Sequence, residues 1–593
     1  MFTKTGETAV SSRTSTPATL EKPNGDASPS HDTLAMEDSN KEETRAGVDD
    51  APTDESGSGG FIFLMTVTAL AMSMFLVSLD MVSGLSHRAK PSNLRTRIFD
   101  ERGVNQYFLP QTIVATAIPK ITEEFGGIED EGWYGSAFFI TLGSFQAAWG
   151  KAYKYFPLKT SFLLSIFLFE VGSLICGVAP NSIALCIGRA ITGVGGAGIS
   201  SGAFTIIALS APPKQRPAYI GILGASYGVA AAIGPLVGGA FTTNISWRWC
   251  FYINLPIGGL AGGIILFFYR PPPPLPFLVT SLTEKLLQMD VPGTLILVSA
   301  LVCYVLALQW GGVSLSWGDS KVVGTLVGFG VLLVVYAMVQ WAQKERAAMI
   351  GRLFHRNVVI MMIYIDLLAG TFFLLVYYLP IYFQVVSGVS AAQSGIRNLP
   401  LILGQSVSTV ISGVALSKFG YPQPFLLVGG VLTAIGSGLL YTLEVNTGSG
   451  KWIGYQLLAG IGIGWCFQVP VVTAQASVAP EDLPSVTAMV LTVQTLGGSV
   501  FVSAGQSAMV NVLLKNLRSE TSTVDAVKVA MTGATELRQK FSSAQMPFIV
   551  AAYMEGLQAA FLVAVVASSV AAVVCLATRW IKFSGQAAAA PAA

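Results

Sequence analysis

The sequence predicts an all-α polytopic membrane protein with fourteen transmembrane helices. Hydrophobic residues make up 52% of the 593 residues, and charged residues make up only 11%. A soluble globular protein carries about 25% charged residues, so this composition excludes a soluble fold. The apolar runs are mostly about 20 residues long, which is the length a helix needs to cross the hydrocarbon core of a bilayer.

The chain is predicted to begin and end with cytosolic tails. Residues 1–59 are rich in Ser, Thr, Glu, Asp, Pro and Gly and poor in large apolar side chains. Such a segment cannot bury enough apolar surface to offset the entropy of ordering, so we expect it to be disordered. The first apolar run begins only at Phe61, and the start of the chain shows no signal-peptide pattern. Residues 583–593 are predicted to form the second tail.

Fourteen apolar runs are separated by polar loops. Their approximate cores are Phe61–Asp80, Trp133–Gly150, Ser161–Val178, Ile183–Leu209, Tyr219–Thr242, Cys250–Tyr269, Pro292–Gly311, Val322–Trp341, Val358–Val385, Asn398–Leu416, Pro424–Leu443, Trp452–Ala474, Val486–Val510 and Phe548–Trp580. Basic residues gather in the loops on the tail's side: Lys151, Lys154, Lys159, Lys214, Arg216, Arg270, Lys285, Lys344, Arg346, Arg352, Arg356 and Lys418. Because cytosolic loops carry the excess of Lys and Arg, both termini should be cytosolic.

A weak internal repeat divides the spans into two halves. The loop after Gly150 matches the segment after Gly413, and Gly193 and Gly195 match Gly460 and Gly462 at nearly the same offset. This predicts a six-helix bundle over 60–270, a linker with two extra helices over 271–350, and a second six-helix bundle over 351–582. Parallel halves that meet at a midplane site are the plan of one large class of transporters.

The fifth span contains an unusual concentration of small residues. Gly228, Gly234, Gly238 and Gly239 would let another helix approach closely, and Pro235 would bend the span. Two interpretations fit. The stretch is either a plain helix-packing face or a gate between the two bundles.

Ionisable residues inside spans are costly and are functional candidates by default. Arg189 is the strongest candidate for proton coupling, and the alternative is a structural pairing with a carboxylate or with backbone carbonyls. Asp80 either binds a proton or caps a broken helix, and Glu170 either accepts a proton or makes a structural hydrogen bond. Polar or aromatic residues that are candidates for a substrate cavity are Gln146, Gln384, Gln456, Gln468, Phe467 and Asp366, although such residues more often serve packing.

The sequence gives no support for several classes of partner and cofactor. Only three histidines and six cysteines occur, and no C-x-x-C spacing is present, so we expect no metal site. The net charge of +2 gives no indication of a nucleic-acid partner. The sequence lacks a G-x-x-x-x-G-K-[ST] motif for ATP. It also lacks the histidine clusters or paired-carboxylate motifs of a membrane enzyme. We therefore expect no cofactor, and a proton gradient as the energy source.

These motifs resemble those of the major facilitator superfamily, in particular its fourteen-span drug:proton antiporter branch. Residues 228–239 look like the antiporter signature of span 5, which implies export. Arg189 followed by Gly193 looks like the span-4 element that the family uses in proton coupling. Residues 247–256, 377–384 and 394–400 are similar to segments of fungal toxin and multidrug exporters. In the loop after Gly150 the family's acidic residue is missing, and Lys154 stands near its place.

One segment interrupts this resemblance. Asp80 and the stretch Thr112–Pro119 look like two pieces of a single span-1 motif, separated by Val82–Gln111. These thirty residues are rich in charge and cannot lie in hydrocarbon. Our hypothesis is a retained intron, because Val82-Ser83 can be encoded by a splice-donor sequence and Gln111 by a codon ending in AG. A genuine external loop is the alternative.

The resemblance implies proton-coupled efflux of an amphipathic small molecule, such as a fungal secondary metabolite, a toxin or a xenobiotic, by alternating access. The expected protein is a monomer in the lipid bilayer of the plasma membrane or of a vacuolar or vesicular membrane. An importer of the same fold, for example of siderophores, is the main alternative, and the antiporter signature counts against it.

Overall fold

The computed structural model describes residues 57–81, 121, 124–125, 133–272, 281–311, 315–520, 525–530, 532, 537–580 and 582. The predicted tails up to residue 56 and over 583–593, the suspected insertion 82–111 and the stretch Thr112–Pro119 lie outside these described residues. The chain divides into residues 1–60 and 61–593, and the features below belong to the second unit. Its described residues form helices and turns, with one isolated β-bridge between Gly311 and Leu315.

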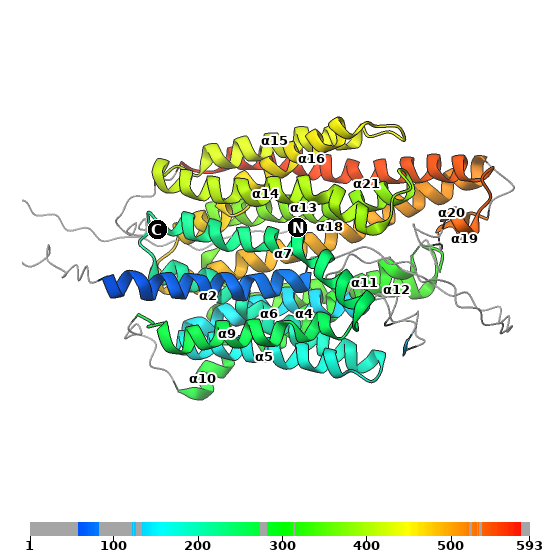
Figure 1. The fold of residues 1–593 in the computed structure, drawn as a ribbon. Helices are drawn as coiled ribbons and strands as arrows, with labels where there is room; N and C mark the ends of the chain where they lie inside the picture. Colours follow the sequence, from blue (N-terminus) through cyan, green and yellow to red (C-terminus); the bar gives the residue numbers. More distant parts are fainter. Residues whose placement is uncertain are drawn as a thin grey trace, which may run out of the picture. The chain divides into compact units, whose positions relative to one another are not determined.

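Six spans form the first bundle, drawn in the lower part of Figure 1. They are α2 (Gly57–Met81), α4 (Trp133–Tyr155), α5 (Leu158–Val178), α6 (Ser182–Ser210), α7 (Arg216–Asn244) and the broken span α8 (Trp249–Tyr252) with α9 (Asn254–Phe268). Helix α6 packs along both α4 and α5, and α5 also contacts α9. Helix α6 is therefore flanked by α4 and α5.

Six further spans form the second bundle. They are α13 (Arg356–Val385), α14 (Ala391–Phe419), α15 (Gln423–Tyr441), the broken span α16 (Ser449–Cys466) with α17 (Val469–Gln475), α18 (Leu483–Glu520) and α21 (Met546–Val574). Helix α13 packs on α18 and α21, while α16 packs on α14 and α15. Short helices α19 (Ala526–Ala530) and α20 (Leu537–Lys540) lie between α18 and α21 in the chain.

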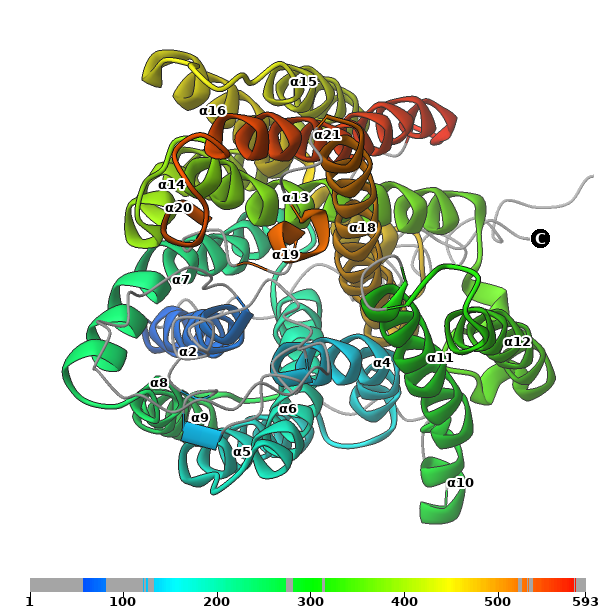
Figure 2. The same cartoon turned by 90° about the vertical axis from the view of Figure 1, so that its right-hand side faces the viewer.

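The linker contributes two extra long helices beside the junction of the bundles. After the short α10 (Leu282–Leu287) come α11 (Val291–Trp310) and α12 (Ser320–Gln343), followed by the turns η3 (Lys344–Arg346) and η4 (Gly351–Leu353). Helix α11 contacts α4, α18 and α12, and Figure 2 shows α12 outside it. The Tyr304 hydroxyl on α11 donates to the Val500 carbonyl on α18 at 3.0 Å. We call the end of the bundles at which α12 ends and α13 begins the linker end.

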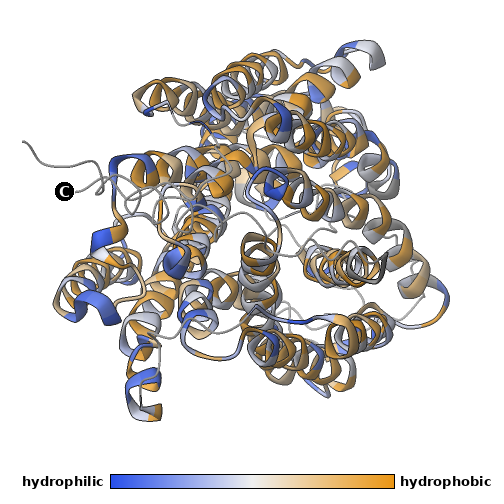
Figure 3. Ribbon diagram, turned by 90° about the vertical axis from the view of Figure 1, so that its left-hand side faces the viewer, coloured by the Kyte–Doolittle hydropathy of each residue, from blue (hydrophilic) through white to orange (hydrophobic). Residues whose placement is uncertain are grey.

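The predicted spans agree with the helices, with differences that have physical causes. Thirteen helices in the described part of the chain are long and apolar enough to span a bilayer. Helix α4 is the fourteenth predicted span. Its 23 residues extend about 34 Å, which is long enough to cross a bilayer, but its polar side chains keep it out of the thirteen apolar helices. Figure 3 shows the helices mainly in hydrophobic colours. Helix α18 runs ten residues beyond its predicted apolar core, because Leu513, Leu514 and Leu517 still pack inside.

The predicted span over 452–474 is broken after Cys466. Pro470 has no backbone N–H and clashes with a continuous helix, so α16 ends and α17 starts again at Val469. Sequence hydropathy does not resolve this break, since apolar residues continue through it.

Candidate coupling site and interbundle gates

An ion pair without solvent exposure joins three helices of the first bundle. Arg189 on α6 donates from Nη1 to Oδ2 of Asp80 at the end of α2, and both side chains are 0% exposed. Its Nε donates to the Tyr134 carbonyl on α4 at 2.8 Å. The guanidinium also lies over the Phe138 ring, 4.5 Å from the ring centre. Arg189 therefore ties α2 and α4 to α6 at one point.

The pair keeps unused hydrogen-bonding capacity. Oδ1 of Asp80 and Nη2 of Arg189 are buried and have no hydrogen-bond partner among the described residues. A buried polar group without a partner costs free energy, so these atoms favour any arrangement that supplies one. A proton on Asp80 would change both the charge and the hydrogen bonding of the pair.

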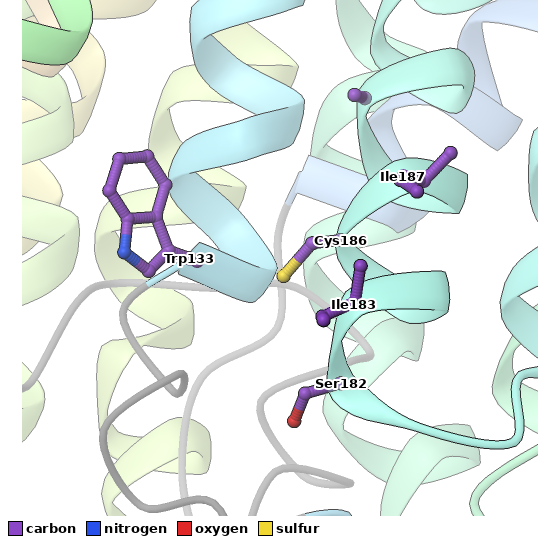
Figure 4. Close-up of a pocket in the computed structure, with 6 residues that line it drawn as sticks. Trp133, Ser182, Ile183, Cys186 and Ile187 are labelled. Atoms are coloured by element: carbon purple, nitrogen blue, oxygen red, sulfur yellow. The ribbon is translucent and has the colours of Figure 1, made fainter.

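A small surface pocket lies between the first turns of α4 and α6, at the end of the bundle opposite the linker end. It is an open pocket of about 300 Å³, lined by Trp133, Ser182, Ile183, Cys186, Ile187 and Ala190. Figure 4 shows Trp133 on one side of it and the α6 side chains on the other. The hydroxyls of Tyr134 and Ser182 share a hydrogen bond of 2.5 Å. The wall of the pocket is therefore linked to the carbonyl that holds Arg189.

Glu170 lies apart from the ion pair, on α5 where it meets α9. A side-chain carbon at Gly258 of α9 would collide with its carboxylate. Both carboxylate oxygens are buried and have no hydrogen-bond partner among the described residues. Nearby, Asn254 donates to the Ser173 hydroxyl at 3.1 Å. The structure thus unites Asp80 with Arg189 and places Glu170 on a second polar face, and the proton-coupling role of all three remains a prediction.

The glycine-rich stretch of α7 meets the second bundle at its beginning. Gly228 lies so close to Ser406 of α14 that a Cβ at Gly228 would overlap the serine hydroxyl. Ala231 and Ile402 continue this contact. Gly234 and Gly238 are also buried, Gly239 is half-buried, and the side chain of Pro235 lies outside the described residues. Further along, Val237 and Phe241 pack on side chains of the first bundle. The interbundle contact therefore lies toward the Gly228 side of the stretch.

Replacing Gly228 by Val is expected to disturb the α7–α14 contact. The new side chain would collide with Ser406, and overpacking of this kind costs about 1–3 kcal/mol. Transport should fall strongly while the amount of protein in the membrane changes little. Gly239→Val is the matched control on the same helix, because a Cβ there meets no described atom within 4 Å. Equal activity of the two variants, measured by cellular efflux, would assign the stretch to plain helix packing.

A network of charges joins the bundles at the linker end. Lys154 of α4 contacts Oδ1 of Asp482, just before α18, at 2.7 Å. Arg352, in the turn η4 just before α13, donates two hydrogen bonds of 2.5 and 2.8 Å to the same carboxylate. Its Nε also contacts Glu345 at 3.0 Å. We call Lys154, Asp482, Arg352 and Glu345 the latch.

Close packing continues from the latch toward the middle of the helices. A Cβ at Gly150 on α4 would lie 2.9 Å from the Pro484 carbonyl at the start of α18. Deeper along the same helix pair, the Thr495 hydroxyl donates to Gln146 at 3.0 Å. Together with the Gly228–Ser406 contact, these contacts run from the helix centres to the linker end. The structure is therefore closed at that end.

The cavity candidates fall into different environments. Gln146 bonds Thr495 across the bundles, and Gln384 donates to Ser394 within the second bundle at 3.1 Å. Asp366 lies against Gly497 of α18. Gln456 is fully buried, and neither of its amide atoms has a hydrogen-bond partner among the described residues.

Two of the candidates face the first bundle near its middle. A Cβ at Gly224 of α7 would lie 3.0 Å from Nε2 of Gln468. The Phe467 ring packs on Phe372 at 5.5 Å, and Phe372 packs on Tyr227 of α7 at 5.6 Å. These aromatic rings come from three spans and from both bundles. Of the predicted cavity candidates, Phe467 and Gln468 are therefore the best placed to contact a substrate between the bundles, whereas Phe372 and Tyr227 were not predicted.

The sequence alone did not identify Asp482, Arg352 or Tyr134 as site residues. Asp482 lies in a Pro-Glu-Asp-Leu-Pro segment at a helix start, which is an ordinary capping pattern. Its partner Lys154 is 328 residues away, so nothing local indicates the pair. The one available signal was Lys154 itself, a basic residue where the resemblance led us to expect an acidic one.

Comparison with known proteins gives a consistent result. The sequence profile of the Major Facilitator Superfamily matches residues 106–502. An MFS-type transporter of a Penicillium species, grgE, is 43% identical over 550 residues, which cover 93% of this chain and 92% of the relative. A probable efflux pump of Penicillium aethiopicum, gsfJ, is 46% identical over 478 residues, covering 80% of this chain and 85% of the relative.

Solved structures share the fold at low sequence identity. A double tryptophan mutant of XylE superposes with a TM-score of 0.54 at 13% identity, covering 88% of this chain and 97% of the other. A bacterial homologue of the human lysosomal transporter Spinster superposes with a TM-score of 0.51 at 17% identity, with the same coverage. These likenesses concern the arrangement of the helices alone.

Proposed function

This chain belongs to the major facilitator superfamily and is a membrane transporter, not an enzyme; on this premise we propose that it exports amphipathic small molecules in exchange for protons. The direction rests on the antiporter-like stretch of α7 and on relatives such as gsfJ that are named efflux pumps. The substrate class rests on the apolar and aromatic residues between the bundles, among them Phe467, Phe372 and Tyr227. Fungal secondary metabolites, toxins and xenobiotics have this chemistry.

The Asp80–Arg189 pair is the observation that carries the proposal. A proton on Asp80 removes its negative charge and leaves the fully buried Arg189 without a counter-ion. An uncompensated buried charge is strongly unfavourable. The bundle therefore lowers its free energy by moving to an arrangement that solvates the guanidinium or pairs it with another group. Because Arg189 ties α2, α4 and α6 together, that movement rearranges the bundle. Proton binding thereby biases the equilibrium between two bundle arrangements.

Two sets of contacts between the bundles, the latch and the α7–α14 contact, act as gates that couple this shift in equilibrium to transport. In the structure the linker end is closed by the latch and by the α7–α14 contact. We place this end in the cytosol, with both termini, because the basic loops lie there. In the proposed cycle, the substrate leaves to the outer side while the linker end is closed. In the same state, protons from the outer side reach the coupling site. Rocking of the bundles about the midplane then opens the linker end to substrate from the cytosol. The protein acts as a monomer in the plasma membrane or in a vacuolar or vesicular membrane.

Cellular accumulation tests the proposed function. Cells with and without the protein are loaded with a panel of fluorescent amphipathic dyes, including rhodamine 6G, with and without a protonophore at matched ATP levels. We expect cells that contain the protein to accumulate less of at least one dye, and the protonophore to abolish the difference. Higher accumulation would indicate import. A difference that survives the protonophore would exclude proton coupling.

A further inference from the structure

A second cavity lies where α12 ends, away from the coupling site. It encloses about 410 Å³ and is lined by Gln340, Trp341, Ala342, Lys344, Glu345, Gly351 and Arg352. Gln340 is already engaged, because it donates to the buried Asp290 at 2.5 Å and accepts from the Met349 N–H at 2.8 Å. The side chains of Trp341 and Lys344 are left to contact a ligand, and Arg352 borders the cavity while it binds Asp482 and Glu345.

This cavity lies at the level of the membrane interface. The outer face of α12 is a stripe of exposed apolar side chains at helical spacing, Val327, Val331, Val334, Met338 and Trp341. Such a stripe on a membrane-spanning helix faces lipid. The stripe ends at Trp341, which is 84% exposed, and tryptophan is enriched where hydrocarbon gives way to lipid headgroups. The next residues, Lys344 and Arg352, therefore lie at headgroup height.

The surroundings of the cavity are basic. Residues 344–356 contain Lys344, Arg346, Arg352 and Arg356 against the single acidic residue Glu345. The Glu345 carboxylate is engaged by Arg352, with both of its oxygens 3.0 Å from Nε. Glu284 likewise binds Arg346, at 2.7 Å. The ammonium of Lys344 is exposed and has no ion-pair or hydrogen-bond partner in the described part of the chain.

The backbone at Lys344 is itself unusual. Its φ is +52°, a region that side-chain-bearing residues rarely adopt, and it marks the end of α12. Residues held in sparsely populated backbone regions concentrate at functional sites and ligand clamps. Lys344 and Gly351 both line the cavity. A Cβ added at Gly351 would meet no described atom within 4 Å. The space beside the lysine is open to a ligand.

We propose that this cavity binds the phosphate headgroup of an anionic phospholipid from the leaflet at the linker end. The Lys344 ammonium contacts the phosphate, the guanidinium of Arg352 borders it, and Trp341 packs beside the glycerol and upper acyl chain. Basic pockets between membrane helices recognise anionic headgroups in this way. An anionic lipid is favoured over a zwitterionic one because a choline or ethanolamine cation would add positive charge to a basic site.

Arg352 links such a lipid to the latch. Its two hydrogen bonds position the Asp482 carboxylate, which in turn binds Lys154 of the first bundle at the linker end. The same contacts raise the pKa of Arg352 above its ordinary value, so deprotonation does not release the latch. A phosphate beside Arg352 competes with Asp482 for the guanidinium. The composition of the leaflet thereby acts on the gate.

Native mass spectrometry of the full-length protein tests the site. The purified protein is titrated with phosphatidylglycerol or with phosphatidylcholine. We expect one phosphatidylglycerol to bind more tightly than phosphatidylcholine, and Lys344→Gln to weaken that binding about fivefold, as expected for one basic residue near a membrane surface. Lys344→Gly is the second variant, because glycine accepts the positive φ and removes the ammonium. Lys321→Gln is the matched control, a basic residue at the other end of α12, and should bind like the wild type.

Several outcomes would overturn the lipid site. These are equal binding of the two lipids, unchanged binding by both Lys344 variants, or an equal loss in Lys321→Gln. Displacement of phosphatidylglycerol by millimolar inorganic phosphate would indicate a site for soluble anions instead. Because the assay measures binding and needs no transported substrate, its failure is distinguishable from a failure of the proposed export.

Discussion

Replacing Arg189 by Ala should abolish protonophore-sensitive export and destabilise the protein. The variant leaves Asp80 buried at 0% exposure without its counter-ion, and breaking a buried pair from one side costs about 3–5 kcal/mol. Asp80→Ala should have a similar effect, because it leaves Arg189 uncompensated. Thermal unfolding of the purified protein and dye accumulation in cells measure the two consequences separately.

The double variant Asp80→Asn with Arg189→Gln separates coupling from stability. It removes both charges at once, and neutral side chains of similar size can hydrogen-bond with each other. We therefore expect it to recover most of the lost melting temperature while export stays uncoupled from the proton gradient. If this stable double variant still exported dye in a protonophore-sensitive manner, the pair would be structural and the proton carrier would lie elsewhere.

Asp482→Asn should open the linker end. Asp482 is 2% exposed and binds both Lys154 and Arg352, so the variant weakens two ion pairs and leaves the mostly buried Lys154 without a carboxylate. Destabilising the closed state by several kcal/mol would raise the ratio of open to closed molecules about tenfold for each 1.4 kcal/mol. A cysteine introduced at Ala488, which is buried opposite Gly150, should then react faster with a membrane-impermeant maleimide.

Glu345→Gln is the control for this experiment. It also removes a carboxylate partner of Arg352, but the Glu345 side chain is 58% exposed, and exposed ion pairs contribute only about 0–1 kcal/mol. Labelling of the cysteine should stay close to the wild-type rate. Labelling of the Asp482→Asn variant at the wild-type rate would mean that the ion pairs of Asp482 do not hold the linker end closed.

The helices and the membrane class could be predicted from the sequence because hydropathy acts locally. A run such as Val358–Val385 must be buried in lipid or protein whatever its neighbours are, and α13 follows it within two residues. The choice of Arg189 and Asp80 as site residues also needed only local information, since a charge within an apolar run is costly anywhere. A structural pair of Arg189 with an unnamed carboxylate was one of the alternatives, and the structure shows that Asp80 is this carboxylate.

The gates could not be predicted in the same way because they depend on contacts between distant segments. The Lys154–Asp482 pair joins residues 328 positions apart, and Gly228 meets Ser406 of another bundle. Neither pattern differs locally from an interfacial lysine or a packing glycine. Gln146 illustrates the same difficulty: its polarity within a span was evident, but its partner Thr495 was not.

Proton movement in reconstituted vesicles tests the central claim most directly. The purified protein is placed in liposomes that contain a pH indicator, and a dye identified as a substrate in cells is added outside. Antiport predicts that dye entry drives protons out, so the luminal pH rises with the wild type and stays constant with the double variant Asp80→Asn, Arg189→Gln. Entry of the dye through the wild-type protein without any change in luminal pH would contradict proton-coupled exchange.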